Sequence, residues 1–279
     1  VGSEMCIRDR YKPNLIASRI SYAKNCLVTP GAYLANSVYA TEDRQAQIPE
    51  FGNVYNIYCQ RCKRNGAMDF DDLLLQTNIL LRDAPDVLAR YQELFKYILV
   101  DEYQDTSIAQ FHLVRLLAGG TNNVCVVGDD DQSIYKFRGA TIENILNFEK
   151  VFTGAKTIRL EQNYRSTANI LNAANSVIKN NMGRKGKTLW TDHGDGEKVH
   201  HYTATNEQDE ASHIADVIGE HLREGASLKD HAVLYRMNAQ SNPIETYFAR
   251  AGIPYRIVGG QRFFDRLSLI HISEPTRRR

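Results

Sequence analysis

The sequence lacks the features by which several broad classes of protein are recognised. It holds one tryptophan, seven prolines and five cysteines among 279 residues, with no internal repeat and no low-complexity segment. No apolar run approaches the roughly 20 residues of a membrane-spanning helix. Neither charge dominates, because 34 Lys and Arg face 33 Asp and Glu. This balance excludes a globally basic nucleic-acid coat but still permits a local basic groove.

The cysteines give little support for a metal centre. Cys59 and Cys62 form a single CxxC in CQRCKRNG, without a second pair or a nearby histidine. A zinc site needs four ligands, so we interpret these residues as two helical thiols rather than as half of a site. Unpaired thiols are typical of a reducing compartment, and we expect a cytoplasmic protein with no membrane partner.

The two ends of the chain are related to each other as DNA. Codons that spell SLIHISEP (268–275) have a reverse complement that can be read as GSEMCIR (2–8). This looks like a library adapter translated at both ends of a sequencing read; native tails related by chance are the alternative. We therefore expect 1–10 and 267–279 to be non-native. Without them, 29 basic and 30 acidic residues remain, in a length that can bury one large core or two smaller ones.

Helical and strand-like segments alternate over most of the chain. Residues 11–66 are helical in pattern, with Pro13, Pro30 and Pro49 as breaks, and Asp83-Ala-Pro ends a later apolar helix. Further helices are predicted after Thr106 or Ser107 with a stop at Gly119, after Ser166-Thr167, and from Asn242-Pro243, with Glu245 as capping acid, to Gly252. Strand-like runs occupy 97–100, 123–128, 156–160 and 232–236. This alternation predicts an α/β fold with a parallel sheet and helical crossovers.

The run YILV ends abruptly in Asp101 and Glu102. Ligands of open α/β sheets bind beyond the carboxyl ends of the strands. One carboxylate could there hold Mg²⁺ while its neighbour orients or deprotonates a water. A solvated strand end is the simpler interpretation of this segment alone.

Two further segments combine charge with aromatic rings. VGDDDQSIYKFRGA (127–140) crowds three aspartates before Gln132 and then interleaves Tyr135 and Phe137 with cations, a pattern that can stack bases. LEQNYRST (160–167) places Tyr164 and Arg165 between a strand-like run and a helix, where they could bind a purine and a phosphate. An acidic loop with core aromatics, and a surface ion pair of Arg165, are the alternatives.

In their order along the chain, these segments resemble the motifs of UvrD/PcrA/Rep-type superfamily 1 DNA helicases. The resemblance spans 67–266, with weaker support over 11–66. It rests on DFDDLL, ILVDEYQDT, VGDDDQSIYKFRGA, RLEQNYRST, LYRMNAQS and GIPYRIVGGQRFFDR. It implies two RecA-like P-loop NTPase motor domains that clamp ATP between them. Residues 11–66 would belong to a helical insert of the first domain, 67–157 would complete that domain, and 158–266 would begin the second.

The resemblance also implies a role for individual residues. Asp101, with Glu102 beside it, would hold Mg²⁺ in the Walker B motif, and Glu102 would activate the attacking water. Gln132 would sense the γ-phosphate, Tyr164 would stack on adenine, and Arg165 would act as an arginine finger. Tyr135, Phe137 and Arg138 would contact DNA. The aspartates Asp69, Asp71 and Asp72 are expected to be structural.

The sequence departs from the family pattern in two ways. Phe137 stands where the family usually has tryptophan, which should weaken stacking without abolishing it. No GxxxxGK[ST] phosphate loop occurs in the 279 residues. We therefore expect an internal piece of a longer protein, inactive as an ATPase by itself.

The implied function is that of an ATP- and Mg²⁺-dependent 3′-to-5′ DNA helicase or translocase. Its substrates would be single-stranded DNA and duplex junctions in repair or replication restart, with protein partners that the sequence does not identify. One alternative is the helicase subunit of a recombination helicase–nuclease. Another is a DNA-binding ATPase relic that no longer hydrolyses, against which Glu102, Gln132 and Arg165 together argue.

Overall fold

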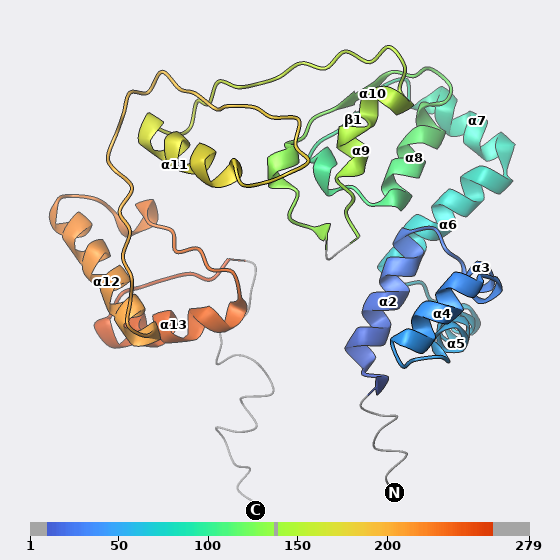
Figure 1. Ribbon diagram of the computed structural model, residues 1–279, viewed down its shortest axis with the longest axis horizontal. Helices are drawn as coiled ribbons and strands as arrows, with labels where there is room; N and C mark the ends of the chain where they lie inside the picture. Colours follow the sequence, from blue (N-terminus) through green and yellow to red (C-terminus); the bar gives the residue numbers. More distant parts are fainter. Residues whose placement is uncertain (1–9, 137–138, 259–279) are drawn as a thin grey trace, which may run out of the picture. The chain divides into compact units, whose positions relative to one another are not determined.

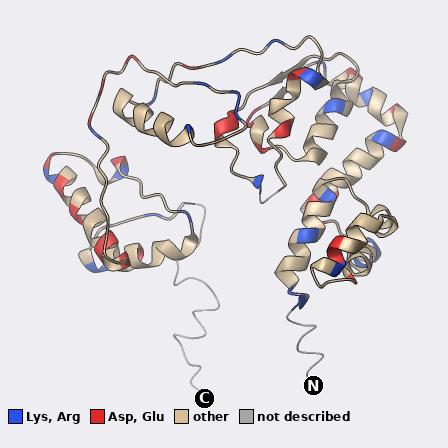
Figure 2. Cartoon of the chain, viewed as in Figure 1, with Lys and Arg blue, Asp and Glu red and all other residues tan. Residues whose placement is uncertain are grey.

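The computed structural model describes residues 10–136 and 139–258, and it is shown in Figure 1. Its contacts divide the chain into two compact units, with the division between Glu197 and Lys198. This division reflects only which residues contact each other. The domain ranges expected from the sequence therefore stay predictions. No helix of the described part is both long and apolar enough to cross a bilayer. Acidic and basic residues are interspersed along the helices (Figure 2).

The N-terminal part is helical, as the sequence predicts. Pro13 and Pro30 occupy the first turns of two helices, where the missing N–H of proline costs nothing, and Thr29 caps the second by accepting from Ala32 N. The helices enclose an apolar core that includes Tyr33 and two completely buried rings, Phe51 and Tyr55. The elements are α2 (Pro13–Asn25), α3 (Pro30–Ala35), α4 (Ser37–Gln45) and α5 (Phe51–Arg64). Cys59 and Cys62 lie on α5, which confirms that they are in a helix.

Helices α6 (Phe70–Asp83) and α7 (Pro85–Leu94) follow and are separated at Ala84-Pro85, as predicted. Asp69 and Asp72 form a capping box at the start of α6. The same two carboxylates bind the ammonium of Lys24 from α2, at 2.6 and 2.8 Å. Asp71 accepts from Asn25 Nδ2 at 2.8 Å. The three aspartates thus join α2 to α6, which agrees with the structural role expected for them.

The Lys24 ammonium is fully buried, and its charge depends on these partners. Burial alone lowers the pKa of Lys24, but the hydrogen bonds and charges of Asp69 and Asp72 outweigh it and raise that pKa above its usual value. Burial likewise opposes the ionisation of Asp69, and hydrogen bonds from Lys24, the Asp72 backbone and Tyr58 bring its pKa below 3.8. Lys24 and Asp69 are therefore both ionised in the neutral range.

Within the described residues, the sheet consists of two parallel strands, β1 (Ile98–Val100) and β2 (Val124–Val126). Between them runs α8 (Ile108–Ala118), which is capped by Ser107 and ends at Gly119, as predicted. Ser107 accepts from Gln110 N, while Gln110 Oε1 accepts from Ser107 N at 2.8 Å. The short helices α9 (Glu143–Leu146) and α10 (Phe148–Val151) follow the second strand. The chain is therefore helix-rich with a small parallel sheet, consistent with part of an α/β domain.

Two of the four predicted strands are wrong. Residues 156–160 and 232–236 are described, and neither segment forms a strand. Their apolar side chains are largely exposed, with Ile158 at 70% and Leu234 at 94%. A strand gains its stability from neighbours that pair with it, and neither segment has such a neighbour among the described residues. Both segments have the apolar pattern of a strand, but no neighbouring strand pairs with either of them among the described residues.

The remaining helices are α11 (Ala168–Ile178), which Thr167 precedes as predicted, α12 (Glu207–Arg223) and α13 (Ser241–Ala251). In the second unit, α12 packs against α13 through Ala211, Ile218, Phe248 and neighbouring apolar residues. Gly252 ends α13 with φ 66°, as predicted. The predicted start of α13 is wrong, because the helix begins at Ser241 with Gln240 as its N-cap. Glu245 is only 4% exposed and supplies no cap.

Replacement of Lys24 by methionine should lower the free energy of unfolding by about 3 kcal/mol, because the partly buried carboxylates lose their counter-charge. Denaturant unfolding at pH 7, followed by circular dichroism, measures this change. Arg82→Met is the matched control: it removes an ion pair with Asp83 in which the side chains are 66% and 57% exposed. That variant should keep the midpoint of the unmodified chain. An unchanged midpoint in Lys24→Met would contradict the role of the cluster.

The stabilisation from this cluster should also depend on pH. Because the folded pKa of Asp69 lies below its usual 3.8, the contribution is complete above that pH and is lost as the pH falls through the lower folded value. The difference in unfolding free energy between the parent and Lys24→Met should therefore shrink in acid. A difference that stays constant from pH 7 down to about pH 2 would argue against this linkage.

Candidate functional site

The two strands bring two polar loops to one edge of the sheet. The parallel register pairs Ile98 with Val124 and Val100 with Val126, so the carboxyl ends of both strands coincide. Pairing continues beyond them, since Val127 N donates to Val100 O at 2.8 Å and Tyr103 N donates to Val127 O at 2.9 Å. The segment after β1 therefore lies beside the loop after β2. Parallel pairing of these two strands agrees with the sequence prediction.

Asp101 and Glu102 occupy a tight turn at the end of β1. Glu102 has φ 50° and ψ 41°, a left-handed conformation that costs a non-glycine residue about 1–2 kcal/mol. The Asp101 carboxylate accepts from the Glu102 amide at 2.9 Å and so stabilises the turn. Both side chains are exposed. The turn places two carboxylates next to each other at the solvent edge of the sheet.

Gln104 links this turn to the second loop, and the sequence analysis did not single it out. Its side chain is 1% exposed. Nε2 donates to Glu102 Oε2 at 2.8 Å, while Oε1 accepts from Asp129 N at 2.9 Å. Its backbone carbonyl accepts from Ser133 Oγ at 3.2 Å. One buried amide thus contacts both segments that carry predicted site residues.

Gly128 makes this close approach of the two loops sterically feasible. A Cβ atom at this position would lie 2.7 Å from Gln104 Oε1, 2.8 Å from Ile145 Cδ1 and 3.1 Å from Tyr103 N. Distances this short are below ordinary van der Waals contact. Gly128 is therefore needed for packing against η1 (Tyr103–Asp105).

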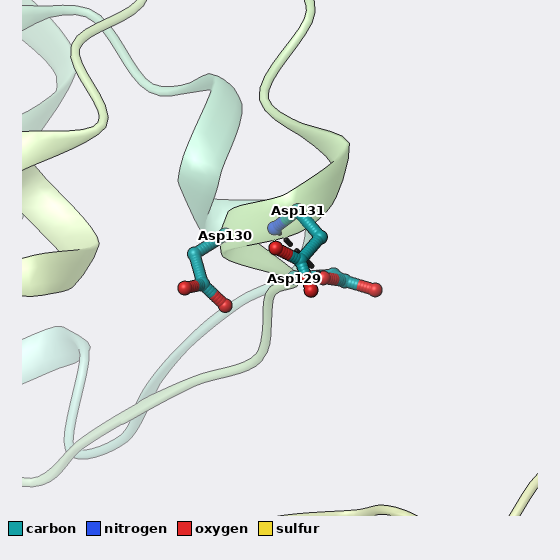
Figure 3. A group of neighbouring side chains, drawn as sticks. All are labelled: Asp129, Asp130 and Asp131. Atoms are coloured by element: carbon teal, nitrogen blue, oxygen red, sulfur yellow. Dashed lines mark hydrogen bonds between the residues drawn. The ribbon is translucent and has the colours of Figure 1, made fainter. Parts of the chain in front are cut away.

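The acidic loop 129–131 is already paired with cations. Its three carboxylates have oxygen atoms within 4.8 Å of one another (Figure 3). Asp129 binds Lys187 Nζ, and Asp131 Oδ2 binds Arg184 Nη2 at 2.6 Å. Asp130 Oδ2 accepts from the backbone N–H of residue 185 at 2.7 Å. The negative charge that the sequence analysis noted is thus compensated by a basic segment more than fifty residues later.

Electrostatics support the ionised state of Asp129. Burial raises the pKa of Asp129, but hydrogen bonds from Lys187 and Gln132 outweigh it and hold that pKa below its usual value. Gln132, at the end of η2 (Asp130–Gln132), donates to Asp129 Oδ2 at 2.8 Å and is itself exposed. The oxygen of its amide accepts no hydrogen bond in the described part of the chain.

The predicted DNA-contacting residues lie beyond this loop, and only one of them is described. Tyr135 is 38% exposed and lines a cavity of about 1290 Å³, which also includes Tyr58 and Phe70. Phe137 and Arg138 lie outside the described residues. The cavity is mixed in character, because carboxylates as well as aromatic rings line it.

Tyr164 and Arg165 lie on a separate turn before α11. Asn163 Oδ1 accepts from the amides of Arg165 and Ser166 at 2.9 and 2.7 Å, and this fixes the turn. The Tyr164 ring is 75% exposed, and its hydroxyl donates to Gln162 Oε1 at 2.8 Å. Within the described chain, the Arg165 guanidinium makes no hydrogen bond or ion pair. Both side chains are therefore available to a ligand.

The structure thus connects some of the predicted site residues through hydrogen bonds, whereas others have no such connection among the described residues. Asp101, Glu102 and Gln132 lie on two loops connected through Gln104. No hydrogen bond or ion pair links Tyr164 or Arg165 to them among the described residues. Gln104, Arg184 and Lys187 were not predicted from the sequence. The spacing Glu102-x-Gln104 was a usable signal for the first, whereas nothing local indicated that 184–187 would pair with 129–131.

The residues at the end of β1 fit a hard divalent cation. Asp101 Oδ2 and Glu102 Oε1 have no hydrogen-bond partner among the described residues, and carboxylate oxygens at a solvent-facing edge are what Mg²⁺ prefers. The aspartates 129 and 131 are less suited, because Lys187 and Arg184 already occupy their carboxylates. The first pair is therefore the better candidate metal site.

Comparisons with known proteins place these features in a family. The model of the UvrD/REP helicase N-terminal domain matches residues 4–153, and that of the UvrD-like helicase C-terminal domain matches residues 158–272. The ATP-dependent DNA helicase PcrA of Staphylococcus aureus (strain Mu50 / ATCC 700699) is 50% identical over 257 residues, which cover 92% of this chain and 34% of that protein.

PcrA of Staphylococcus epidermidis (strain ATCC 35984) is 48% identical over 269 residues, which cover 95% of this chain and 35% of that protein. The chain therefore spans about a third of the length of the curated relatives it matches. Both family matches reach into the terminal stretches that the sequence analysis set aside, and the origin of those stretches stays a prediction.

Replacement of Gly128 by alanine should destabilise the chain by about 1–3 kcal/mol, because its Cβ would overlap Gln104, Ile145 and the Tyr103 backbone. Denaturant unfolding measures the effect. Gly31→Ala is the control, since nothing lies within 4 Å of a Cβ built there, and it should leave stability close to that of the parent. Equal stability of the two variants would show that the loops after β1 and β2 can move apart without loss of unfolding free energy.

Proposed function

Because the chain belongs to the UvrD/REP helicase family, we propose that it is part of an ATP-dependent DNA helicase that moves along single-stranded DNA. Matches to the N-terminal and C-terminal family models, in order, are the observation that carries this proposal. The RecA-like fold of this family explains why Asp101, Glu102 and Gln132 follow the carboxyl ends of parallel strands. The PcrA relatives are described as ATP-dependent DNA helicases.

The strand-end carboxylates supply the reaction centre in this proposal. Asp101, with Glu102 beside it, holds Mg²⁺, which when bound neutralises phosphate charge. Glu102 orients the attacking water and accepts its proton, as a carboxylate in hydrogen-bond reach of that water can. Support comes from the turn at Glu102, which exposes one carboxylate oxygen while Gln104 fixes the other.

The exposed side chains on the other loops complete the nucleotide site. Gln132 contacts the γ-phosphate, because its carbonyl and amide can bridge a phosphate and a second group. Tyr164 stacks on adenine, and Arg165 stabilises negative charge that develops on the γ-phosphate. The exposure of the Tyr164 ring, at 75%, and an Arg165 guanidinium that is unpaired among the described residues are the features that support these roles.

The nucleic acid is proposed to pass the segment that follows Gln132. Tyr135 stacks on a base, with Phe137 and Arg138 as further DNA contacts that lie outside the described residues. A 3′-to-5′ direction, action at duplex junctions, and a part in repair or replication restart belong to the same proposal, as does a cytoplasmic location. Residues 11–66, 67–157 and 158–266 are proposed as insert, first motor domain and second motor domain.

Two alternatives lead to different expectations. A helicase subunit of a recombination helicase–nuclease would show a nuclease domain in the longer reading frame. A DNA-binding relic would bind nucleotide without turnover. The combination of Glu102, Gln132 and Arg165 at exposed positions favours hydrolysis over the relic.

The catalytic proposal concerns a longer protein, because these 279 residues contain no GxxxxGK[ST] phosphate loop. The isolated chain is proposed to lack ATPase activity. Experiments on turnover therefore need a full-length helicase that joins this chain to such a loop.

In that full-length protein, Glu102→Gln should reduce DNA-stimulated ATP hydrolysis by about 10²–10⁴-fold, because the amide cannot accept the proton. ATP and single-stranded DNA should still bind, since the side chain keeps its size. Steady-state ATPase assays and equilibrium binding measure the two effects. ATPase activity equal to that of the parent would reject Glu102 as the general base.

Tyr164→Ala should weaken ATP binding by about tenfold or more, because an aromatic stack is worth ~1–3 kcal/mol. Binding of single-stranded DNA should change much less. Fluorescence titrations with labelled nucleotide and labelled oligonucleotide measure both. Tyr164→Phe is the control, since it retains the ring and removes only the hydroxyl that contacts Gln162. A larger loss of DNA binding than of ATP binding would reassign the ring to the nucleic acid.

A further inference from the structure

We propose that Gln104 is a positioning residue that aims the Glu102 carboxylate and couples it to the loop carrying Gln132. The inference rests on the proposed function, because it gives Gln104 a task only where Glu102 acts on the attacking water. Gln104 itself is buried and does not face a ligand. It acts through the two groups that it contacts.

The amide of Gln104 is used at both ends. Nε2 donates to Glu102 Oε2 at 2.8 Å, and it also lies 3.5 Å from Asp105 Oδ2. Oε1 accepts from Asp129 N at 2.9 Å. Because a primary amide is a donor at one end and an acceptor at the other, it can satisfy a carboxylate and a backbone N–H at the same time. A carboxylate or a thioether in this place could not do both.

The contact with Glu102 fixes which carboxylate oxygen remains free. Glu102 sits on a left-handed turn, and its exposed side chain has no other hydrogen-bond partner among the described residues. With Oε2 engaged by Gln104, Oε1 is the oxygen that has no hydrogen-bond partner among the described residues. Loss of the contact would leave the carboxylate free to rotate among several orientations, which lowers the fraction that is correctly aimed.

The contact with Asp129 extends this control to the second loop. Asp129 accepts from Asp131 N at 3.0 Å and from Gln132 Nε2 at 2.8 Å, so its position sets that of Gln132. Ser133 Oγ is held by the Gln104 carbonyl in addition. Gly128 keeps the two backbones close enough for these bonds. A movement of the Gln132 loop would therefore be transmitted to Glu102 through a single side chain.

Two substitutions separate the two halves of this role. Gln104→Met removes both bonds at nearly constant volume. Gln104→Glu keeps an oxygen that can accept from Asp129 N, but it replaces the donor to Glu102 with a second carboxylate. Thermal unfolding of each variant checks that it folds. Gln92→Met is the matched control, since it removes a glutamine bond to the Leu116 carbonyl away from the site.

In a full-length helicase that contains this chain, both Gln104 variants should lower kcat of DNA-stimulated ATP hydrolysis by about 10–100-fold. KM for ATP should stay within about threefold, because neither substitution removes a nucleotide contact. In the 279-residue chain, hydrogen exchange at the Asp129 amide should become faster in Gln104→Met and stay slow in Gln104→Glu. Gln92→Met should leave kcat and this exchange unchanged.

Normal kcat in Gln104→Glu, with a loss only in Gln104→Met, would show that Gln104 merely holds the loop and would overturn the inference. Normal kcat in both variants would overturn it as well. Full ATPase activity in Glu102→Gln would instead refute the proposed function from which the inference starts. The exchange at Asp129 is read without any nucleotide, so it reports on the contact independently of turnover.

Discussion

The parallel pairing of Ile98–Val100 with Val124–Val126 is the constraint on which the candidate site depends. It brings the carboxyl ends of two strands to one edge, although more than twenty residues separate them in the sequence. The polar groups that follow the two strands therefore lie next to each other. Gly128 sets how closely they approach, because a side chain at this position would occupy the space of the Gln104 amide. A short sheet thus organises a much larger set of loop contacts.

Charge compensation is the second feature that runs through the structure. The chain is almost neutral overall, yet it concentrates carboxylates at 69–72 and at 129–131. Each group is matched by cations from elsewhere, by Lys24 in the first case and by Arg184 and Lys187 in the second. Burial of these charges would be costly without such partners. By contrast, Asp101 and Glu102 have no cation beside them in the described chain, which distinguishes them as groups open to an external ion.

The family relationship and the geometry of the site give complementary information. The two family models identify the class of motor, while the strand-end geometry indicates which side chains are free to act and which are engaged in the fold. Asp129 and Asp131 form an acidic cluster in the sequence, but their ion pairs assign them a structural task. Tyr164 and Arg165 are exposed and held by the Asn163 turn. Their relation to the strand-end groups belongs to the proposed function.

The sequence by itself determined local features: several helix starts and stops, the strand-like runs, and the residue types at the strand ends. These depend on neighbours within a few positions, such as a capping serine, a helix-initiating proline or a terminal glycine. The tertiary structure alone decided which apolar runs became strands, since 156–160 and 232–236 have strand-like composition but no partner to pair with. It also decided that Gln104 bridges two loops and that 184–187 neutralises 129–131. Both are contacts between distant segments, and their energies depend on burial and distance that no local pattern records.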